Sequence, residues 1–505
     1  MKAHDKHIVI VGAGPGGLTA AMILAHRGFR ISVFEAKDTV GGRNAPIHMD
    51  GYTFDTGPTF LMLKTILDEV FHEAGAATDS LMDMRRIEPM YRLVFTDKSI
   101  EPVSDPDAMT ALLKRLYPGR EQGYRAFHKR EAVRLAKLFP CLQKPYHTFS
   151  SLFSLDMLAA VPHLALGRSL FDVMKGYFGD EELALAFTFQ SKYLGMAPWE
   201  CPGLFSIIPF IEHSLGIYHP IGGLSRISEC MAEVARRDGA EIHLSTRVKR
   251  ILVKDGAARG IELENGEQIH GDDVVINADF GYAAQSLFEP GVLRKYTPER
   301  LGRMRVSCST FMLYLGLDKK YDAPHHTICF ADDYRAHIDA VSRGEELKTD
   351  ISFYLRNADQ TDPTIAPDGG SAVYVLVPVP NARGRVDWAA ARDTYRDVVL
   401  DAVERRTEMT DIRQHIRAEH MITPDEWEHD YNVFDAATFN LAHNWGQLIY
   451  FRPRNKFEEL DHCYLAGGGT HPGSGLPTIY ESGRIAANLI SRAHGIPFVS
   501  ANLHV

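Results

Sequence analysis

Short, uninterrupted runs of β-branched and aliphatic residues occur near the start and in the middle of the chain. Residues 8–11 form one run before a glycine, residues 31–34, interrupted by Ser32, give a second apolar segment before Glu35, and residues 274–276 form another run. Runs of this length are typical of strands buried on both faces of a parallel sheet. Since residues 18–25 indicate a helix between the first two runs, the pattern predicts a strand–helix–strand unit.

Alternating apolar and polar positions predict further strands. A helix is predicted over residues 225–237, and Asn265–Gly266 indicates a tight turn. The alternating segments that predict strands are residues 240–244, 247–253, 260–263, 309–317, 351–355 and 372–379. The chain is therefore predicted to mix parallel and antiparallel sheets with helices.

A glycine-rich turn joins the first strand to the first helix. Gly12, Gly14 and Gly17 fit G-x-G-x-x-G, with Pro15 and Gly16 between them. The first glycine permits a tight turn, the second lets the backbone approach a pyrophosphate, and the third lets the helix pack on the strand. The N–H groups at the start of the helix then face the phosphates. This pattern predicts a dinucleotide site.

Glu35 ends the second strand, 21 residues after Gly14. A carboxylate at this place accepts hydrogen bonds from the hydroxyl groups of an adenosine ribose. NAD and FAD share this unit, and the next segment favours FAD. Ala36 is followed by Gly42 and Arg43, which indicate a loop close to the cofactor. A predicted strand over residues 51–55 then ends in a turn at Gly57, Pro58 and Thr59.

A second glycine-rich loop lies near the C-terminus, between a predicted strand at residues 464–466 and a helix that runs to Ala493. The loop N–H groups and the positive end of the helix favour negative charge, such as the N1–C2=O edge of a reduced flavin. The loop residues predicted to touch a cofactor are Gly468, Gly469, Gly475, Leu476 and Pro477.

These motifs together resemble those of the FAD-dependent amine-oxidase and carotenoid-desaturase superfamily. The string Gly-Thr-His-Pro-Gly-Ser-Gly-Leu-Pro over residues 469–477 closely resembles the C-terminal signature of bacterial carotenoid desaturases. Residues 216–223 look like the aromatic-Pro-x-Gly-Gly turn of that family, and residues 447–453 look like its Gln…Phe-Arg-Pro element. The resemblance thus covers essentially the whole chain.

The resemblance implies an α/β fold with a discontinuous, Rossmann-type FAD-binding domain. That domain would comprise residues 1–75, 216–284 and 456–505. The inserted substrate domain would combine a mixed sheet with apolar helices: a helical, apolar, membrane-facing lid over residues 76–215, and the substrate-binding sheet with its helices over residues 285–455.

The resemblance also implies roles for single residues. The Gly-Gly-Arg loop would follow the ribose-binding acid, and the Asp-x-Gly-Pro turn would lie against the flavin ring. Val248 would lie near the adenine, and Ala278 and Asp279 near the pyrophosphate. His471 would lie beside the flavin, either as a general base or as a residue that orients the glycine loop.

Three departures from the family pattern bear on the subfamily. Ile221 stands where a lysine is common, residues 467–469 carry no acid, and residues 481–484 read Glu-Ser-Gly-Arg where small apolar or lysine residues are frequent. The missing acid weakens the amine-oxidase interpretation and agrees with the desaturase branch. The exact subfamily stays open.

Composition excludes several other classes. The 505 residues include 55 Lys and Arg against 65 Asp and Glu, a net charge of −10, which argues against a nucleic-acid partner. Six cysteines lie far apart without a C-x-x-C pair, which indicates free thiols in a reducing compartment. The pair His325–His326 has no third ligand at convincing spacing, so no metal site is expected.

Membrane contact is expected at the surface of the bilayer only. No uncharged apolar run reaches the roughly 18 residues of a span, and the longest candidate, residues 201–211, holds two prolines. Residues 149–211 are nevertheless unusually apolar, which leaves two interpretations open: an ordinary helical core, or a lid that rests on a bilayer. We expect a cytoplasmic protein attached peripherally to the inner face of the cell membrane.

The absence of certain catalytic motifs from the sequence bears on the type of reaction. No motif for a Ser-His-Asp triad, a reactive cysteine or a carboxylate pair is visible. Hydride abstraction from an allylic carbon leaves a cation whose proton is strongly acidic, so even a weak base or water suffices. A hydrocarbon substrate offers no polar group, so tunnel shape must recognise it.

We therefore predict an FAD-dependent desaturase that introduces double bonds into a linear C30 or C40 carotenoid precursor. Four alternatives stay open: a late-acting carotenoid desaturase, an end-group oxygenase, a squalene-type hydrocarbon oxidoreductase, and a non-enzymatic prenyl-lipid carrier. The number of desaturations, the terminal electron acceptor and the oligomeric state do not follow from the sequence.

Overall fold

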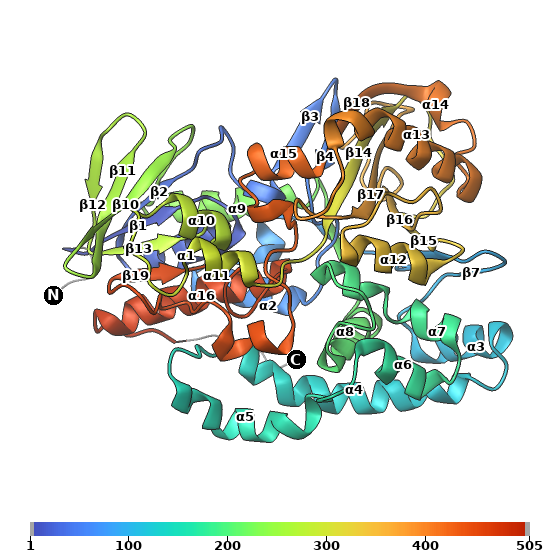
Figure 1. Cartoon of the computed structure of the whole chain (residues 1–505), viewed down its shortest axis with the longest axis horizontal. Helices are drawn as coiled ribbons and strands as arrows, with labels where there is room; N and C mark the ends of the chain where they lie inside the picture. Colours follow the sequence, from blue (N-terminus) through green and yellow to red (C-terminus); the bar gives the residue numbers. More distant parts are fainter. Residues whose placement is uncertain (1–4, 500–505) are drawn as a thin grey trace.

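The computed structural model describes residues 5–499, so the outer ends of the first and last predicted ranges, residues 1–4 and 500–505, lie outside it. Figure 1 shows two sheets side by side, with a layer of helices beneath them. The chain passes from the first sheet to the second and back twice, and its last strand belongs to the first sheet.

The first sheet is parallel and lies at the left of Figure 1. In the described residues its strand order is β19 (Cys463–Leu465), β13 (Asp273–Ile276), β1 (His7–Val11), β2 (Arg30–Phe34) and β9 (Glu241–His243). The central strand is buried from Ile8 to Val11, as its β-branched run predicted. The packed helices are α1 (Pro15–His26), α2 (Lys64–Glu73), α9 (Ser225–Arg237) and α16 (Leu476–Ala493). The predicted Rossmann-type unit is confirmed.

An antiparallel sheet packs on the other face of the first sheet. It contains β10 (Val248–Lys254), β11 (Ala257–Leu263) and β12 (Gln268–His270). The predicted turn at Asn265–Gly266 joins the last two strands, with Gly266 at φ +87°. The sheet thus brings Val248 beside Phe34 at the end of β2, in one apolar cluster.

The second sheet lies at the right of Figure 1 and runs β18–β14–β17–β16–β15–β6–β7 in the described part of the chain. Its strands are β6 (Arg92–Val94), β7 (Ser99–Ile100), β14 (Ser309–Leu317), β15 (His326–Cys329), β16 (Phe353–Asn357), β17 (Ser371–Val379) and β18 (Ile416–Ile422). Helix α13 (Trp388–Arg406) covers one face, where Phe311 and Leu313 point. The opposite face, with Met312 and Tyr374, lines a cavity.

Two strands of this sheet come from a segment predicted to be helical. β6 and β7 belong to the range 76–215, and β6 pairs in parallel with β15 from residue 327 to residue 329. The range is therefore not helical throughout. Strands of two or three residues are too short to show an alternating pattern, so only the partner strand, more than 200 residues away, defines them.

The helical layer contains α3 (Pro106–Leu116), α4 (Glu121–Leu142), α5 (Leu155–Ala160), α6 (Leu170–Phe178), α7 (Glu181–Ala186) and α8 (Ile207–Leu215). Its apolar residues divide into two groups. Those of α6, with Phe171 and Met174, are buried in the main core. Those around α5 are exposed, with Phe153 at 63% and Leu155 at 85%. The helical-core interpretation therefore describes α6, while the residues around α5 are exposed and the bilayer interpretation stays a prediction.

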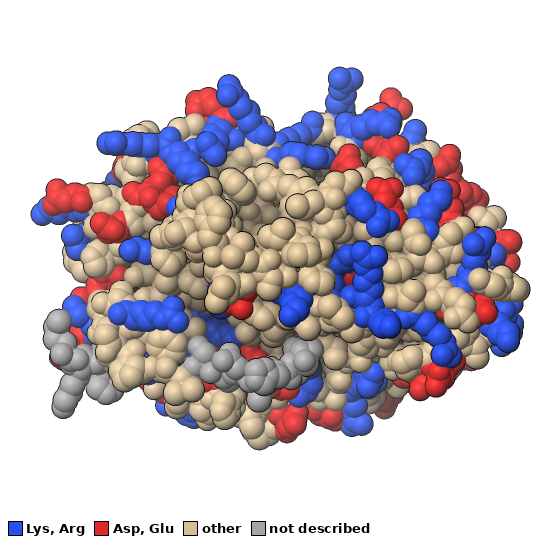
Figure 2. Space-filling view, turned by 90° about the horizontal axis from the view of Figure 1, so that it is seen from below, with Lys and Arg blue, Asp and Glu red and all other residues tan. Residues whose placement is uncertain are grey.

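The face beneath α4 and α5 is shown in Figure 2, which has an area of uncharged residues toward its middle, bordered by Lys and Arg side chains. Six exposed large apolar residues come from residues 149–166: Phe149, Phe153, Leu155, Leu158, Val161 and Leu166. We call these six the α5 patch. Among residues 5–499, no helix combines the length and hydrophobicity needed to cross a bilayer.

Helices α10 (Phe280–Ser286) and α11 (Pro298–Arg303) follow β13 and pack in the apolar cluster of the first sheet, where Phe280 and Leu301 are buried. Helices α12 (Tyr334–Arg343), α14 (Ile412–His415) and α15 (Pro424–His429) accompany the strands of the second sheet. A two-stranded hairpin, β3 (Pro46–Met49) and β4 (Tyr52–Asp55), carries the chain from the first sheet to the second. A second pair, β5 (Met84–Arg86) and β8 (Tyr218–Pro220), carries it back.

Candidate active site

A cavity of about 540 Å³ runs between the two sheets. One end is lined by the glycine-rich turns at Gly12 and Gly467, and the other by aromatic side chains of the second sheet, such as Tyr354 and Tyr374. The molecule thus joins a site built from backbone N–H groups to an apolar chamber. Such a division fits a polar cofactor lying next to an apolar substrate.

The first glycine turn forms the start of helix α1. Gly12 has φ +93°, a left-handed conformation that favours glycine, and a Cβ there would lie 3.0 Å from the Asn277 carbonyl oxygen. At Gly17 a Cβ would lie 2.3 Å from the Gly12 carbonyl oxygen, so helix and strand approach as the motif predicts. No acidic residue stands in the first turn of α1, and Gly14 at its N-cap provides no side-chain cap. The helix start is open to an anionic group.

Glu35 is fixed by two backbone N–H groups on the cavity wall. Its Oε2 accepts from Ala13 at 2.8 Å and its Oε1 accepts from Lys37 at 2.9 Å. Each carboxylate oxygen keeps further acceptor capacity. Glu35, Ala36 and Val248 line the same cavity, so the residues predicted to meet a ribose and its adenine lie together.

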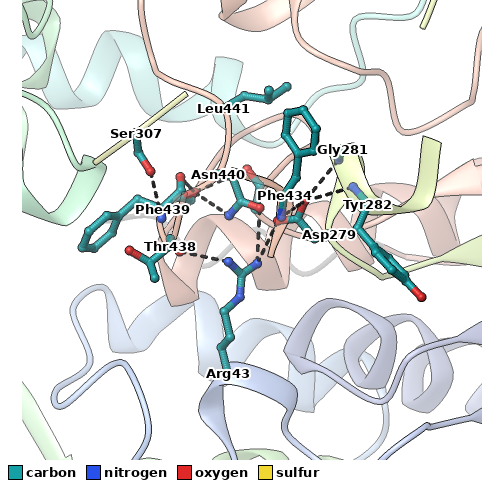
Figure 3. Close-up of polar contacts among 12 residues, drawn as sticks. Arg43, Asp279, Gly281, Tyr282, Ser307, Phe434, Thr438, Phe439, Asn440 and Leu441 are labelled. Carbon is teal, nitrogen blue, oxygen red and sulfur yellow. Dashed lines mark hydrogen bonds and ion pairs between the residues drawn. The ribbon is translucent and has the colours of Figure 1, made fainter. Parts of the chain in front are cut away.

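Arg43 and Asp279 both line the cavity, and their side chains point toward each other (Figure 3). Arg43 donates to the Thr438 carbonyl at 2.9 Å and to Asn440 Oδ1 at 3.2 Å, and its Nη2 lies 3.7 Å from Asp279 Oδ2. Burial raises the pKa of Asp279, against the effect of Arg43. Because three backbone N–H groups donate to Asp279 Oδ1, namely those of Gly281, Tyr282 and Phe434, the carboxyl group is held in one position.

The second glycine loop is held from behind by Arg452. This guanidinium is fully buried and donates to the Gly468 carbonyl at 2.6 Å and to the Thr470 carbonyl at 3.1 Å. It also donates to the carbonyls of Leu441, Ala442 and Gln447. Burial lowers the pKa of Arg452 to about 9. The Gln…Phe-Arg-Pro element thus orders the loop that ends at Gly475, the N-cap of α16.

Most of the residues predicted from sequence to bind a cofactor line this one cavity. They are Gly12, Gly14, Pro15, Glu35, Ala36, Gly42, Arg43, Gly57, Pro58, Thr59, Val248, Ala278, Asp279, Gly468, Gly475, Leu476 and Pro477. They come from eight separate stretches of the chain, which only the fold brings together.

Four predicted residues lie behind the cavity wall. Gly16 and Gly17 pack α1 against Asn277, and a Cβ at Gly469 would lie 2.7 Å from the Cβ of Phe280. His471 is buried away from the cavity lining, with its Nε2 3.0 Å from the Lys144 carbonyl. Burial lowers its pKa to about 4, so the ring is neutral at pH 7. His471 therefore lies where it can orient the loop, and it does not line the cavity.

The aromatic end of the cavity was not predicted. Tyr374, Leu376 and Pro378 line it as every second residue of β17. The alternation that predicted this strand could have identified this face, but not its role, because the opposite face is also buried. Two hydroxyls from this region secure the turn after β4: Tyr374 donates to the Gly57 carbonyl at 2.9 Å, and Tyr314 donates to the Thr56 carbonyl at 2.6 Å.

The residues that line the cavity have the chemical groups needed to bind FAD. Gly42 and Gly475 have φ +55° and +110°, and a Cβ at either would meet no atom closer than 3.5 Å outside its neighbours, so both backbones face open space. The starts of α1 and α16 both point uncapped N–H groups there. Asp279 Oδ2 is buried and accepts no hydrogen bond from the described residues. Together they offer donors to phosphates and to a flavin edge, and acceptors to hydroxyl groups.

Comparisons with known proteins agree with this geometry. Residues 15–491 match the family of flavin-containing amine oxidoreductases. The chain is 50% identical over 496 residues to a 4,4'-diapophytoene desaturase (4,4'-diapolycopene-forming) of Methylomonas sp, which covers 98% of this chain and 97% of that protein. It is 37% identical to an all-trans-zeta-carotene desaturase of Myxococcus xanthus, covering 97% of this chain and 94% of that protein.

Solved structures show the same fold at low identity. An oxidoreductase from Methanosarcina mazei has a TM-score of 0.64 at 17% identity, covering 96% of this chain and all of that one (100%). Putrescine oxidase bound to putrescine has a TM-score of 0.64 at 13% identity, covering 97% and 99%. At these identities the likeness concerns the fold only.

Proposed function

The chain belongs to the carotenoid-desaturase branch of the flavin-containing amine oxidoreductases, and on that premise we propose that it introduces double bonds into a linear C30 polyene such as diapophytoene. It is an FAD-dependent oxidoreductase. The observation that supports the proposal is one cavity in which most of the residues predicted to hold a dinucleotide adjoin an aromatic, apolar chamber.

The residues that hold FAD are divided between the two glycine-rich regions. The start of α1 would hold the pyrophosphate, Glu35 would accept from the ribose hydroxyls, and the loop before α16 would hold the flavin edge. When bound, the flavin supplies an acceptor for the hydride that leaves an allylic carbon. The turn at Gly57 lies between this region and the aromatic chamber.

The second sheet positions the substrate. Flat aromatic rings and aliphatic side chains, among them Phe60, Met312 and Tyr374, line the chamber and match an unbranched polyene by shape. These walls hold the reacting carbons against the cofactor and keep water from the cation that hydride loss leaves behind. None of these steps requires a strongly basic side chain.

Chain length is the finer part of the proposal. The relative at 50% identity is named for a C30 substrate, whereas the zeta-carotene relative, named for a C40 one, is 37% identical. We therefore favour diapophytoene. Separate incubations with diapophytoene, phytoene, lycopene and squalene, followed by absorption and mass analysis, test this choice. Diapophytoene should lose hydrogen fastest, and faster conversion of phytoene would contradict the C30 assignment.

We also propose that the protein binds the inner face of the cell membrane through the α5 patch. The support is a water-insoluble substrate together with exposed apolar residues such as Phe153 and Leu155, at 63% and 85% exposure. With a net charge of −10, attraction to anionic lipid contributes little, so binding should survive high salt.

Vesicle flotation tests this attachment. Leu155→Asp places a charge in the apolar contact and should release the protein from vesicles. Gln268→Asp, on the exposed strand β12, adds the same charge outside the patch and serves as the matched control. Equal flotation of Leu155→Asp and the control, or no flotation of the wild type at any salt concentration, would contradict the proposal.

A further inference from the structure

Three polar side chains form a continuous hydrogen-bonded line in the wall of the aromatic chamber. Thr59 Oγ1 lies 2.6 Å from the Tyr354 hydroxyl, and that hydroxyl lies 2.7 Å from His326 Nδ1. All three residues line the cavity. When His326 accepts from Tyr354, the single hydroxyl hydrogen of Tyr354 is used, so Thr59 donates to Tyr354. Both hydrogen bonds then run in the same direction, from Thr59 to Tyr354 and from Tyr354 to His326.

The line begins at the turn that separates the cofactor region from the chamber. Thr59 follows Gly57 and Pro58, and the Gly57 carbonyl is fixed by Tyr374. The other neighbours of the line are aromatic: Phe60 meets the His326 ring edge-on at 5.2 Å between centroids, and it meets Tyr193 at 5.6 Å. A polar line in such a wall provides no recognition of a hydrocarbon, so it requires another explanation.

The hydrogen-bonded line ends at His326, whose ring contacts a group of buried histidines. The His325 and His326 rings lie 4.3 Å apart, and the His219 and His325 rings lie 5.0 Å apart. His219 Nε2 is 2.9 Å from Asp362 Oδ2, with both side chains fully buried. His219 Nδ1, His325 Nε2 and His326 Nε2 have no hydrogen-bond partner among the described residues. Three imidazoles thus lie in series, each with one nitrogen unused.

This group is not a metal centre, because within residues 5–499 no three His, Cys, Asp or Glu side chains are placed to hold a metal ion. The charges that face it are Arg356 and Asp55, whose side chains pair at 3.1 Å and are buried. Burial lowers the pKa of His325 and His326 well below 6.5, and the Arg356 cation acts in the same sense. Both rings are therefore neutral at pH 7, and each is a weak base that takes a proton only from a strong acid, such as the cation that hydride loss leaves.

We propose that the line Thr59–Tyr354–His326 carries away the proton released when the new double bond forms. This inference rests on the proposed desaturation. One substrate hydrogen leaves with its electron pair to the FAD, and the neighbouring C–H bond then breaks, its electron pair becoming the new π bond. Thr59 Oγ1 takes that proton as its own hydrogen moves to Tyr354 and the hydrogen of Tyr354 moves to His326 Nδ1. Thr59 and Tyr354 end unchanged, and His326 holds one added proton.

The His326→Gln variant distinguishes a proton-carrying role of His326 from a purely structural one. In His326→Gln the amide oxygen still accepts from Tyr354, but an amide takes no proton at neutral pH. We expect His326→Gln and Tyr354→Phe to slow a single anaerobic turnover of diapophytoene by at least about 100-fold, the usual contribution of a positioned proton acceptor. FAD occupancy and Tm, measured on the same preparations, should stay near the wild-type values.

Two further measurements address the line itself. The hydroxyl hydrogens of Thr59 and Tyr354 exchange with solvent, so wild-type turnover should be slower in D2O, and this solvent isotope effect should disappear in Tyr354→Phe. The isotope effect should persist in Tyr374→Phe. This variant removes a cavity hydroxyl that donates to the Gly57 carbonyl and therefore lies outside the line. Added imidazole should restore part of the rate of His326→Ala, because the truncated side chain leaves room for it.

The outcomes are distinguishable. Wild-type turnover in His326→Gln, or no imidazole effect on a slow His326→Ala, would overturn the relay while leaving the desaturase assignment intact. An FAD-loaded wild type that converts no polyene would remove the proposed function, and the relay with it.

Discussion

Arg452 donates to the main-chain carbonyl of Gly468 at 2.6 Å and thereby joins two motifs that lie apart in the sequence. The guanidinium is fully buried and has no carboxylate among its hydrogen-bond partners in the described residues; all of its acceptors are carbonyl groups. A buried charge is tolerated there because backbone dipoles satisfy it. The glycine loop before α16 therefore has its shape imposed by one side chain beneath it.

Arg452→Lys should loosen that loop. Lysine has three donors where the guanidinium has five, so at least two carbonyl groups lose charge-assisted hydrogen bonds, which costs about 3–6 kcal/mol of unfolding free energy. We expect a lower Tm and a lower FAD occupancy. Arg454→Lys, two residues along, is the matched control. Unchanged FAD occupancy and Tm in Arg452→Lys would show that the loop keeps its shape without the guanidinium.

Glu35→Ala should weaken FAD binding. The loss of one charge-assisted hydrogen bond to the ribose, about 1.5–3 kcal/mol, corresponds to roughly 10- to 100-fold in Kd. The substitution also leaves the N–H groups of Ala13 and Lys37 without their acceptor. FAD titration of the apo-protein measures the effect, and equal affinity in mutant and wild type would exclude the ribose role.

Substitution by valine should have different effects at two glycines of the C-terminal loop. Gly475 has φ +110° and lines the cavity, so Gly475→Val strains the backbone and blocks the cofactor. Gly469 lies outside the cavity lining, and a Cβ there would lie 2.7 Å from the Cβ of Phe280. We expect Gly475→Val to abolish FAD binding and Gly469→Val chiefly to lower the Tm of the apo-protein. The reverse order of effects would contradict the placement of the loop.

His471 should affect stability more than turnover. Burial lowers its pKa from 6.5 to about 4, so the unfolded chain binds a proton below pH 6.5 while the native ring stays neutral until about pH 4. Stability is therefore lost as pH falls through this window, by up to about 3 kcal/mol. In His471→Asn this part of the decline should vanish, which denaturant unfolding at pH 7 and pH 4.5 would reveal.

Desaturation by the FAD-loaded His471→Ala protein should continue at a moderately reduced rate, since the side chain lies outside the cavity lining. A correctly folded, FAD-loaded variant that reduces no flavin anaerobically would show that His471 takes part in the chemistry.

Local patterns predicted the cofactor half of the molecule well. Strand, turn and helix follow one another within residues 8–35, so neighbouring residues suffice to define the α1 start and Glu35. The contacts that complete the site join distant segments. Arg43 meets Asn440 across 397 positions, and Thr59 meets Tyr354 across 295. No periodicity or spacing indicates such pairs, because they depend on how the two sheets face each other.

The substrate half was predicted only in outline. β14 and β17 were expected from alternation, but both faces of this sheet are buried, so the pattern could not tell the cavity face from the face beneath α13. Leucine and phenylalanine occur both in the exposed α5 patch and in the buried α6, and only packing distinguishes the two. Burial is decided by partners far along the chain, which composition does not reveal.

If the cavity joins an FAD site to a chamber for a linear polyene, hydride passes directly from substrate to flavin within it. This transfer can be followed by mixing the FAD-loaded protein anaerobically with diapophytoene and recording the absorption spectrum over time. The oxidised-flavin band should bleach in step with the appearance of a longer-wavelength polyene band. A flavin spectrum that stays unchanged while diapophytoene is recovered intact would contradict direct transfer.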